Sequence, residues 1–392
     1  MRLQYIPLLI LILLNVGVDY YIARGLRGLI KKAHVAVSIL MFAVIVAVLF
    51  MPVRSIGGGL LIAAMWMLFT YLTVYASKYV FIIFSLLSRI PRLWHAPRWK
   101  WLNRAGIILG WLTFAAMWWG ALFNRFNIDV ERVTVEIPGL PEQFDGYTIA
   151  QLSDLHVGTY GNDTTYLHKV VETVNALHPD VIMFTGDIVN SRSEELIPHA
   201  PVLARLEALD GVYSIMGNHD YGDYSEWPSD EAKRDNLHLL HRLQQEDMGW
   251  KLLLNRADFI RRDSAEIAVI GVENIGDPPF HIYGDLNKAY ATPGDSLTKI
   301  LLSHNPAHWV ESIADDSGKN IALTLSGHTH AMQIEAFGWS PAVFRYPTWG
   351  GLYTSDNTDN KLYVNIGIGT VGMPARIGAT PEITLITLKR LP

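Results

Sequence analysis

Five short blocks of residues that commonly bind metals, each placed after a strand-like run, constrain this chain more than any other feature of its sequence. The blocks are Ser153–His156, Thr185–Asp187, Met216–Asp220, Leu302–His304 and Ser326–His330. In α/β proteins the carboxyl ends of neighbouring strands carry the functional side chains. Side chains so distant in the sequence can meet only if the chain folds them around a shared centre. The pattern predicts an α/β domain whose strand ends converge on a pair of divalent cations.

The candidate ligands combine carboxylate, amide and imidazole groups. They are Asp154, His156, Asp187, Asn218, His304, His328 and His330. Such a mixed oxygen and nitrogen set suits Mn, Fe, Zn or Co better than Ca or Mg. The chain contains no cysteine, so thiolate ligands are excluded. Taken singly, a buried His or Asp is more often a hydrogen-bonded structural residue, but five blocks in one ordered arrangement favour a metal centre.

A pair of cations at these positions would give the chain a specific chemistry. Two ions about 3.5–4 Å apart can hold a phosphate and lower the pKa of a bridging water, so that hydroxide attacks phosphorus. A carboxylate such as that of Asp187 has two oxygens and can bridge both ions. His219 lies beside a ligand position without being needed as a ligand. It is therefore a candidate to protonate the leaving oxygen.

The first third of the chain is apolar, unlike the remainder. Four stretches are long enough to cross a bilayer as helices, near Ile6–Ala23, His34–Val53, Gly57–Leu87 and Ala105–Phe123. We interpret the first as a retained span, because it lacks a small-residue cleavage site and three more spans follow. We therefore expect a membrane domain of about four helices over residues 1–126 and an α/β domain over residues 127–392.

The basic residues of the short connections predict how these spans are oriented. The second connection holds only Arg54, whereas the first and third connections are strongly basic: Arg24, Arg27, Lys31 and Lys32, then Arg89, Arg92, Arg98, Lys100 and Arg104. Basic connections face the cytoplasm. With four spans, both termini and the α/β domain are expected outside the cytoplasm.

Asp19 lies within the first apolar stretch, close to its end. An intramembrane carboxylate is by default a candidate functional site. Its neighbours Tyr20, Tyr21 and Arg24 are residues typical of the membrane interface. We therefore expect Asp19 to anchor the helix at the interface, with an intramembrane functional role as the alternative.

In the second part of the chain, strands and helices alternate early and strands dominate late. Helices are expected over Asn162–Leu177, Glu194–Leu209 and Ser229–Met248. The strand-like runs are Tyr147–Leu152, Val181–Phe184, Val212–Met216, Ile267–Val272, Ile300–Leu302, Ile321–Leu325, Leu362–Ile366 and Ile383–Leu388. This order predicts two sheets packed face to face with helices outside. The net charge of −5 offers no basic field for nucleic acid, so no nucleic-acid partner is expected.

The five blocks resemble the signature of the calcineurin-like metallophosphoesterase superfamily, which reads D-x-H, G-D, G-N-H-[DE], an isolated H, and G-H-x-H. Within it they are similar to a bacterial branch of phosphoesterases, some of them membrane-attached. The resemblance runs from Tyr147 to the C-terminus and implies an αββα sandwich, here preceded by the helical transmembrane bundle. It also implies a dinuclear centre with His219 as the catalytic histidine. One metal would be held by Asp154, His156, Asp187 and His330, and the other by Asp187, Asn218, His304 and His328.

The chain departs from the protein Ser/Thr phosphatases of that superfamily. Those enzymes continue G-D-x-V-D-R-G, and the acid that supports their catalytic histidine is replaced here by Asn190. Phosphoprotein substrates are therefore disfavoured, and the group that orients His219 is left open, with Asp220 as one candidate. Arg376 is a candidate phosphate contact, because a guanidinium pairs well with phosphate; a surface ion pair is the alternative. The segment Phe337–Tyr353 either lines the pocket or is a plain loop.

These observations lead to one expected function and two alternatives. We expect a membrane-anchored phosphoesterase that uses two divalent ions outside the cytoplasm to hydrolyse a phosphoester or pyrophosphate. Anchoring favours a lipid-linked substrate. The alternatives are a cytoplasm-facing hydrolase of a nucleotide–lipid pyrophosphate, and a non-catalytic metal-binding sensor module.

Overall fold

The computed structural model describes residues 5–276, 281–290, 294 and 296–391, with the side chains of residues 5–9 left out. The chain forms two compact units. The helical unit comprises residues 1–53, 63–122 and 373–375. The second unit, here named the catalytic unit after the function expected from the sequence, comprises residues 54–62, 123–372 and 376–392. The predicted domain boundary near residue 126 stays a prediction.

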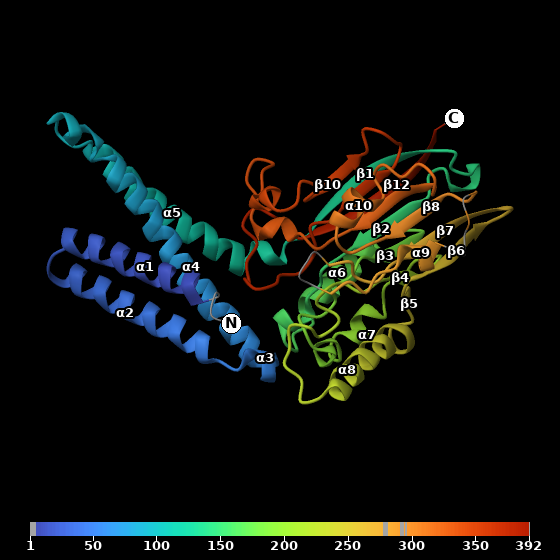
Figure 1. The fold of residues 1–392 in the computed structure, drawn as a ribbon, viewed down its shortest axis with the longest axis horizontal. Coiled ribbons are helices and arrows are strands. Elements are labelled where there is room, and N and C mark those ends of the chain that lie inside the picture. The colour runs from blue at the N-terminus through green and yellow to red at the C-terminus, as the bar shows by residue number, and fades with distance from the viewer. Residues whose placement is uncertain (1–4, 277–280, 291–293, 295, 392) are drawn as a thin grey trace. The chain divides into compact units, whose positions relative to one another are not determined.

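The helical unit consists of long helices. They are α1 (Tyr5–Gly25), α2 (Gly28–Phe50), α4 (Gly58–Leu87) and α5 (Lys100–Leu122), with the short helix α3 (Val53–Ile56) after α2 (Figure 1). Within the described residues, three segments are long and apolar enough to cross a membrane: Gly28–Phe50, Gly58–Trp94 and Lys100–Phe126. A fourth span over α1 stays a prediction.

Glycines let α4 and α5 approach each other closely. A Cβ on Gly106 would lie 2.6 Å from Cβ of Phe84, and one on Gly110 would lie 3.0 Å from the carbonyl oxygen of Ser77. Small residues at helix contacts of this kind are typical of membrane helices, where packing replaces the hydrophobic effect.

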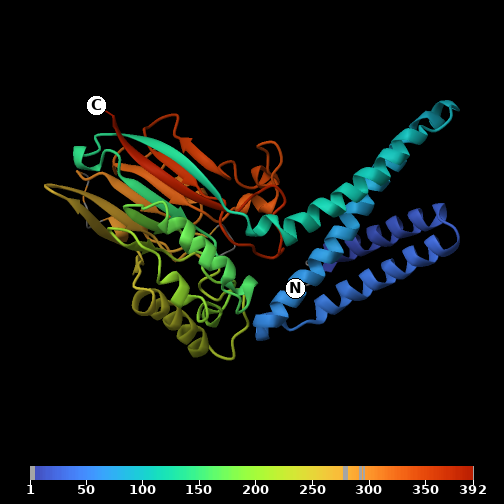
Figure 2. The same cartoon turned by 180° about the vertical axis from the view of Figure 1, so that it is seen from behind.

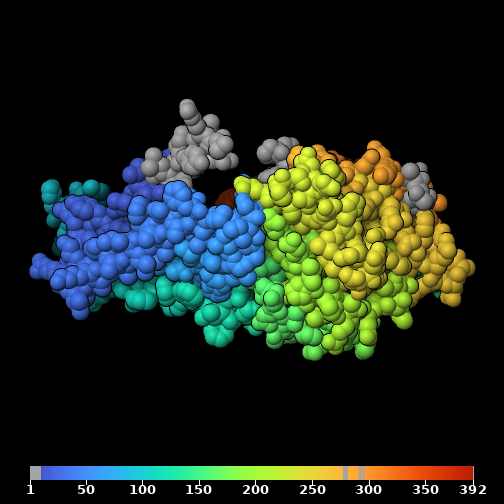
Figure 3. Space-filling view, turned by 90° about the horizontal axis from the view of Figure 1, so that it is seen from below, coloured from blue at the N-terminus to red at the C-terminus, as the bar shows by residue number. Residues whose placement is uncertain are grey.

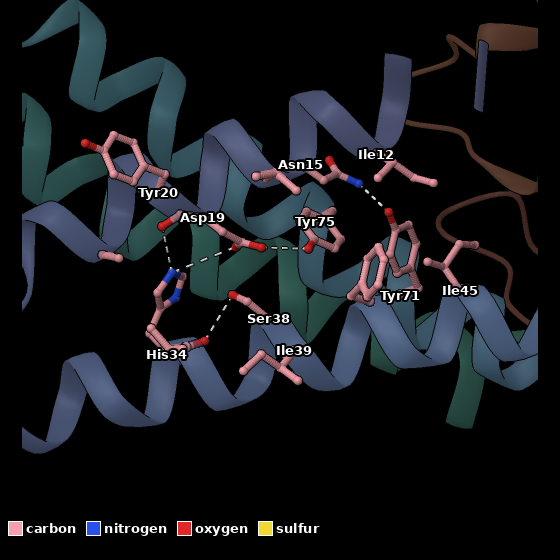
Figure 4. Close-up of a pocket in the computed structure, with 14 residues that line it drawn as sticks. Ile12, Asn15, Asp19, Tyr20, His34, Ser38, Ile39, Ile45, Tyr71 and Tyr75 are labelled. Carbon is pink, nitrogen blue, oxygen red and sulfur yellow. Dashed lines mark hydrogen bonds and ion pairs between the residues drawn. The ribbon is translucent and has the colours of Figure 1, made fainter. Parts of the chain in front are cut away.

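Asp19 lies in a mostly buried polar cluster of the helical unit, and its expected place at the membrane interface stays a prediction. Its side chain is 15% exposed and pairs with Nζ of Lys78 at 2.6 Å. The hydroxyl of Tyr75 donates to its other carboxylate oxygen at 2.8 Å, and Nε2 of His34 lies 3.8 Å away. Figure 4 shows His34 and Tyr75 directed at Asp19 beside a cavity of about 390 Å³ between α1, α2 and α4. The carboxylate therefore joins three helices.

The catalytic unit contains two six-stranded sheets. In the first sheet the order is β1 (Asp129–Pro138), β12 (Glu382–Leu391), β2 (Thr148–Leu152), β3 (Val181–Phe184), β4 (Val212–Ser214) and β5 (Lys251–Leu252). In the second it is β10 (Gly351–Thr354), β11 (Lys361–Val364), β9 (Ile321–Ser326), β8 (Lys299–Leu302), β7 (Ala265–Gly271) and β6 (Arg256–Arg262). Strands β2 to β5 are parallel, and so are β7, β8, β9 and β11. Parallel pairing places their carboxyl ends at one edge of each sheet.

The two sheets pack face to face, and helices cover their outer sides. One buried apolar cluster combines Ile149 and Val181 of the first sheet with Ile300 and Leu325 of the second. A second cluster joins the first sheet to α6 (Thr165–Asn175), α7 (Ala200–Leu203) and α8 (Asp230–Arg242). A third joins the second sheet to α9 (Leu286–Tyr290) and α10 (Ala307–Ser312). The predicted αββα sandwich is confirmed (Figures 1 and 2). In the space-filling view, green and yellow residues make up most of the visible face of this unit (Figure 3).

The predicted helix over Glu194–Leu209 is wrong. The chain forms a 3-10 turn over Ser193–Leu196 and then the four-residue α7. Pro198 and Pro201 lie in this stretch. Proline lacks the backbone N–H and clashes with the preceding turn, so one continuous helix cannot form there.

Candidate metal centre

Strand ends of both sheets carry the seven candidate ligands. In the first sheet, Asp154 and His156 follow β2, Asp187 follows β3 and Asn218 follows β4. In the second sheet, His304 follows β8, whereas His328 and His330 follow β9. Because the sheets are stacked, these ends meet, and the structure brings all seven predicted residues together.

The ligand atoms form two neighbouring groups. Asp154, His156 and His330 make one, and Asp187, His304 and His328 make the other; within each group the ligand atoms lie within 4.8 Å of one another. The amide oxygen of Asn218 adds to the second group, 3.2 Å from Nε2 of His304. These contacts link residues far apart in the sequence. The residues that follow the strand ends therefore lie close together, as the sequence pattern predicts.

The spacing within each group fits a shared cation. Nε2 of His330 lies 3.0 Å from Nε2 of His156 and 3.1 Å from a carboxylate oxygen of Asp154. In the other group, Nδ1 of His328 lies 3.3 Å from Nε2 of His304. Ligands about 2.1 Å from one ion are separated by roughly 3.0–3.4 Å in octahedral or tetrahedral geometry. The residues present therefore fit divalent transition metals.

Asp187, a member of the second group, also lies close to the first. Its Oδ2 is 3.6 Å from Nε2 of His156 and 3.2 Å from Nε2 of His304. Its Oδ1 accepts a hydrogen bond from the backbone N–H of His219 at 2.8 Å. One carboxylate oxygen thus faces ligand nitrogens of both groups, which is the position that a bridging ligand requires.

Backbone geometry turns the ligands toward this centre. Asp154, His156, Asp187, His328 and His330 all have positive φ angles, between 44° and 73°. Non-glycine residues rarely adopt this region, and such conformations cluster at functional sites. Five of the seven candidate ligands are held in the left-handed region where the chain leaves a strand.

Asp220 holds the loop that carries Asp187. Its buried carboxylate accepts hydrogen bonds from the backbone N–H groups of Asp187, Ile188 and Gly217 at 2.8–2.9 Å. Burial, together with the negative charge of Asp187, raises the pKa of Asp220 to about 7. Asp220 therefore fixes the position of the central carboxylate.

His219 is oriented by a backbone carbonyl. The hypothesis that Asp220 orients it is wrong. Nδ1 of His219 donates to the carbonyl oxygen of Asn190 at 2.6 Å. The ring lies edge-on to His156, with centroids 4.8 Å apart, and packs on Tyr224 at 4.4 Å. With Nδ1 bonded to the carbonyl, Nε2 is the ring nitrogen available for another partner.

Burial and neighbouring charges shift the pKa values of four candidate ligands. Burial lowers the pKa of His328 to about 4 and holds that of His156 well below its usual value. Burial raises the pKa of Asp187, but His304 and His219 outweigh this effect and hold it well below the usual range. Burial likewise lowers the pKa of His304, but the Asp187 carboxylate outweighs it and raises the value to about 9. Ionised carboxylates and neutral imidazoles are the forms that bind metals, so His328 and His156 are ready to bind, whereas His304 has to release a proton to do so.

Arg376 lies behind the centre. It is fully buried, so the surface ion-pair alternative is wrong. Its guanidinium donates to the carbonyl oxygens of Gly369 at 2.8 Å and Ile366 at 3.0 Å, and lies 3.2 Å from Nδ1 of His330. Contact with a substrate phosphate stays a prediction.

A cavity of about 230 Å³ borders the centre. Its lining comprises Asn218, Tyr224, Asn274, Gly276, Asn305, His328, Arg345 and Tyr346. The hydroxyl of Tyr346 lies 2.9 Å from Nε2 of His328, and Asn218 donates to the hydroxyl of Tyr224 at 2.9 Å. Both tyrosines were missed as site residues. Tyr346 falls in the segment Phe337–Tyr353 that was considered as pocket lining, whereas Tyr224 carried no recognisable signal.

Comparison with known proteins agrees with this geometry. Residues 2–125 match a family described as "Probable Calcineurin-like phosphoesterase, transmembrane domain", and residues 147–332 match the calcineurin-like phosphoesterase family. The uncharacterized metallophosphoesterase YkuE of Bacillus subtilis is 32% identical over 267 residues, covering 67% of this chain and 86% of the relative.

Similar proteins also occur in animals. A transmembrane protein with metallophosphoesterase domain from Danio rerio is 34% identical over 271 residues, which cover 66% of this chain and 57% of that relative. The chain thus spans just over half the length of this animal relative. The solved structure of SoxB, a sulfate thiohydrolase, aligns with a TM-score of 0.36 at 14% identity, covering 64% of this chain and 57% of SoxB, which is too distant to bear on function.

Proposed function

The chain belongs to the calcineurin-like phosphoesterase family, and from that membership we propose that it is a membrane-anchored hydrolase of a lipid-linked phosphoester or pyrophosphate. In this proposal two divalent ions from the set Mn, Fe, Zn and Co are held by the seven ligands, with Asp187 shared. The observation that carries the proposal is the position of the Asp187 carboxylate, 3.6 Å and 3.2 Å from imidazole nitrogens of the two groups.

The residues around the ions have distinct tasks. When bound, the cations supply stabilisation of phosphoryl oxygens and a water of lowered pKa. Asp154, His156 and His330 form one binding group, and Asn218, His304 and His328 complete the other around Asp187. His219, with Nδ1 fixed by the Asn190 carbonyl, presents Nε2 and donates a proton to the leaving oxygen. Asp220 keeps the backbone of Asp187 in place.

A lipid-linked substrate is favoured by the membrane-spanning segments, since an enzyme anchored in a bilayer meets lipids at high local concentration. The cavity beside the centre has the polar lining that a phosphate-bearing head group requires, with Asn274, Asn305 and Arg345 near His328. We place the catalytic unit outside the cytoplasm, because the two basic connections are expected to face inward.

The first experiment tests the metal-dependent reaction. The purified full chain, supplied with Mn²⁺, is expected to hydrolyse bis(p-nitrophenyl) phosphate and to lose this activity with a chelator. Asp187→Asn is expected to reduce turnover by at least about 100-fold, since replacing even an outer-shell partner of a metal ligand costs 10–100-fold. Asp359→Asn, at an exposed position, is the matched control. Full turnover in Asp187→Asn would refute the shared-carboxylate centre.

The second experiment tests the substrate class. Lipids extracted from membranes are incubated with the enzyme and with the Asp187→Asn variant, and phosphorus-bearing species are followed by mass spectrometry. The proposal expects one lipid-linked ester or pyrophosphate to disappear with the active enzyme alone. Hydrolysis of soluble esters with every lipid species unchanged would contradict the lipid-linked part.

A further inference from the structure

The catalytic unit exposes an unusual group of large apolar side chains in residues 332–344, here named the aromatic loop. Phe337 is fully exposed, Phe344 is 83% exposed and Trp339 is 51% exposed. Met332, Ile334 and Val343 of the same loop are also exposed. Several large apolar side chains exposed on one short loop are typical of an interaction site, whereas single exposed apolar residues need no explanation.

Hydrogen bonds and a contact between two rings hold the aromatic loop in place. The hydroxyl of Ser340 donates to the carbonyl oxygen of Ala331 at 2.6 Å, and the backbone N–H of Glu335 donates to Ile377 at 2.8 Å. Trp339 packs edge-on against Phe344, with ring centroids 5.9 Å apart. These contacts fix the apolar side chains on the outside.

The tip of the aromatic loop carries backbone strain. Ala336 and Trp339 pair as an antiparallel bridge, and the two residues between them, Phe337 and Gly338, have φ angles of 55° and 74°. Turns of this kind normally take Asn or Gly at both central positions. A bulky residue in the left-handed region is an outlier that persists where the surrounding structure over-determines it, commonly at functional sites.

The aromatic loop is continuous with the candidate metal centre. Arg345 and Tyr346 follow Phe344 directly and line the cavity beside His328. The Tyr346 hydroxyl lies 2.9 Å from Nε2 of His328. A molecule held by the aromatic loop would therefore lie next to the cavity in which hydrolysis is proposed.

We propose that the aromatic loop docks on the surface of a lipid bilayer and presents the head group of a lipid-linked substrate to the cavity. This proposal rests on the function proposed above and specifies how the enzyme reaches its lipid-linked substrate. Trp and Phe favour the membrane interface, and the neighbouring Arg345 supplies a cation that pairs with lipid phosphate. The exposed tip inserts among the head groups, and the cavity receives the phosphate.

The chain itself keeps a bilayer within reach of the catalytic unit. Helix α5 ends at Leu122 and β1 begins at Asp129, so six residues join the last helix to the first strand. Six residues reach at most about 20 Å even when fully extended, and the 3-10 turn over Asn124–Phe126 makes this link shorter. A second copy of the chain is a poorer occupant, because a specific protein interface needs about 20–30 residues on each side and the loop offers six apolar side chains.

A labelling experiment tests the docking directly, and the absence of cysteine makes it specific. Phe344→Cys and Leu209→Cys are each labelled with an environment-sensitive fluorophore in the full chain, reconstituted into phosphatidylethanolamine–phosphatidylglycerol vesicles. Both positions are 83% exposed. Leu209 precedes β4 at its amino end, whereas the aromatic loop follows β9 at the carboxyl end where the centre lies.

The proposal expects a blue-shifted emission at position 344, quenched by nitroxide lipids and shielded from iodide. The label at position 209 should be quenched by iodide and unaffected by nitroxide lipids. Equal behaviour of the two labels overturns the proposal. So does shielding at 344 without quenching by nitroxide lipids, since the loop is then covered by protein.

A second measurement links docking to catalysis. Turnover of a soluble aryl phosphodiester is compared with turnover of the same ester carried on an acyl chain in vesicles. The ratio of vesicle to soluble turnover is expected to fall by at least about tenfold in Phe337→Ser/Phe344→Ser, since both substitutions remove large apolar side chains that would be buried in the bilayer. Leu209→Ser should leave the ratio unchanged, and an unchanged ratio in the double variant overturns the proposal.

The two proposals fail in distinguishable ways. An inactive wild-type chain contradicts the proposed function, while the fluorescent labels still report whether the aromatic loop meets lipid. An active chain with a water-exposed label at position 344 contradicts the docking alone.

Discussion

His219 differs from the metal-ligand candidates by its surroundings. It belongs to neither group of ligand atoms, and its Nδ1 is used by the Asn190 carbonyl. The carbonyl takes the place of the acid found in the protein Ser/Thr phosphatases. For orienting His219, the backbone of residue 190 therefore matters more than its side chain. This arrangement fixes the imidazole without adding a negative charge beside the centre.

Replacing His219 should separate catalysis from metal binding. His219→Gln is expected to lower kcat by about 100-fold to 10,000-fold, the usual contribution of a general acid. The loss should be smaller for a p-nitrophenyl ester than for an alkyl ester, because nitrophenolate leaves without protonation. Metal content per chain, measured in parallel, should equal that of wild type. Loss of metal together with an equal rate loss on both esters would mean that His219 is a ligand.

His308 in α10 is buried and its Nδ1 lies 2.9 Å from the Ser303 hydroxyl. Burial lowers the pKa of His308 to about 4. A histidine with a depressed pKa in the folded state contributes stability above its unfolded pKa of about 6.5, and this contribution is lost as the pH falls through about 4.

A single substitution tests this pH dependence. Thermal unfolding midpoints of wild type should fall between pH 6.5 and pH 4, and the fall should be shallower in His308→Gln. The contribution at stake is at most about 3 kcal/mol. His238→Gln, at an exposed position of α8, is the control and should follow wild type. Identical pH profiles for His308→Gln and wild type would rule out this source of acid sensitivity.

At the scale of elements, a buried ion pair strengthens the contact between α1 and α4, which hydrogen bonds of Asn15 and an apolar cluster also hold. Asp19 and Lys78 are 2.6 Å apart, with side chains 15% and 12% exposed. Removing one partner of a buried pair leaves an uncompensated charge, whereas removing both is much less costly. The ion pair therefore stabilises the contact between α1 and α4 with only two charged side chains.

A double-mutant cycle tests this ion pair. Lys78→Met alone should lower the thermal midpoint of the full chain in detergent, with a cost on the order of 3 kcal/mol. Asp19→Asn combined with Lys78→Met should recover most of the loss, because no unpaired charge remains. Additive losses in the double variant would show that the two side chains do not interact.

Several elements follow from the sequence, and others depend on contacts that a sequence pattern does not contain. The apolar runs before the five ligand blocks predict β2, β3, β4, β8 and β9, because buried strands read as continuous apolar segments. Strand β6 (RADFIRR) was missed, since its charged residues hide the pattern of an edge strand. The partner of Asp19 is 59 residues away, and only helix packing selects Lys78.

In the candidate centre, too, some features could be predicted from the sequence and others could not. Residue types and strand ends predict the seven ligands, and the structure gathers all of them. The orientation of His219 could not be predicted, because its partner is a backbone carbonyl 29 residues away. The burial of Arg376 could not be predicted either, because its guanidinium donates mainly to main-chain oxygens, which no sequence pattern reveals.

At the scale of the whole molecule, the number of spans decides on which side of the membrane the catalytic unit works. Basic residues gather in two of the three connections, and four spans would put the catalytic unit outside the cytoplasm. Alkaline phosphatase fused after Pro392 should therefore be active, because its disulfides form only outside the cytoplasm. A second fusion carries, at the same position, a reporter that fluoresces only in the cytoplasm. An inactive alkaline phosphatase fusion together with a fluorescent second fusion would support the inverted topology and a cytoplasmic substrate.

The central claim is that the Asp187 carboxylate joins two metal ions. Electron paramagnetic resonance of the metal-free chain titrated with Mn²⁺ tests it most directly, because two manganese ions bridged by one ligand give an exchange-coupled spectrum. The account predicts that wild type reaches this spectrum at two ions per chain and that Asp187→Asn does not. Two uncoupled six-line signals in wild type, or an unchanged coupled spectrum in Asp187→Asn, would contradict it.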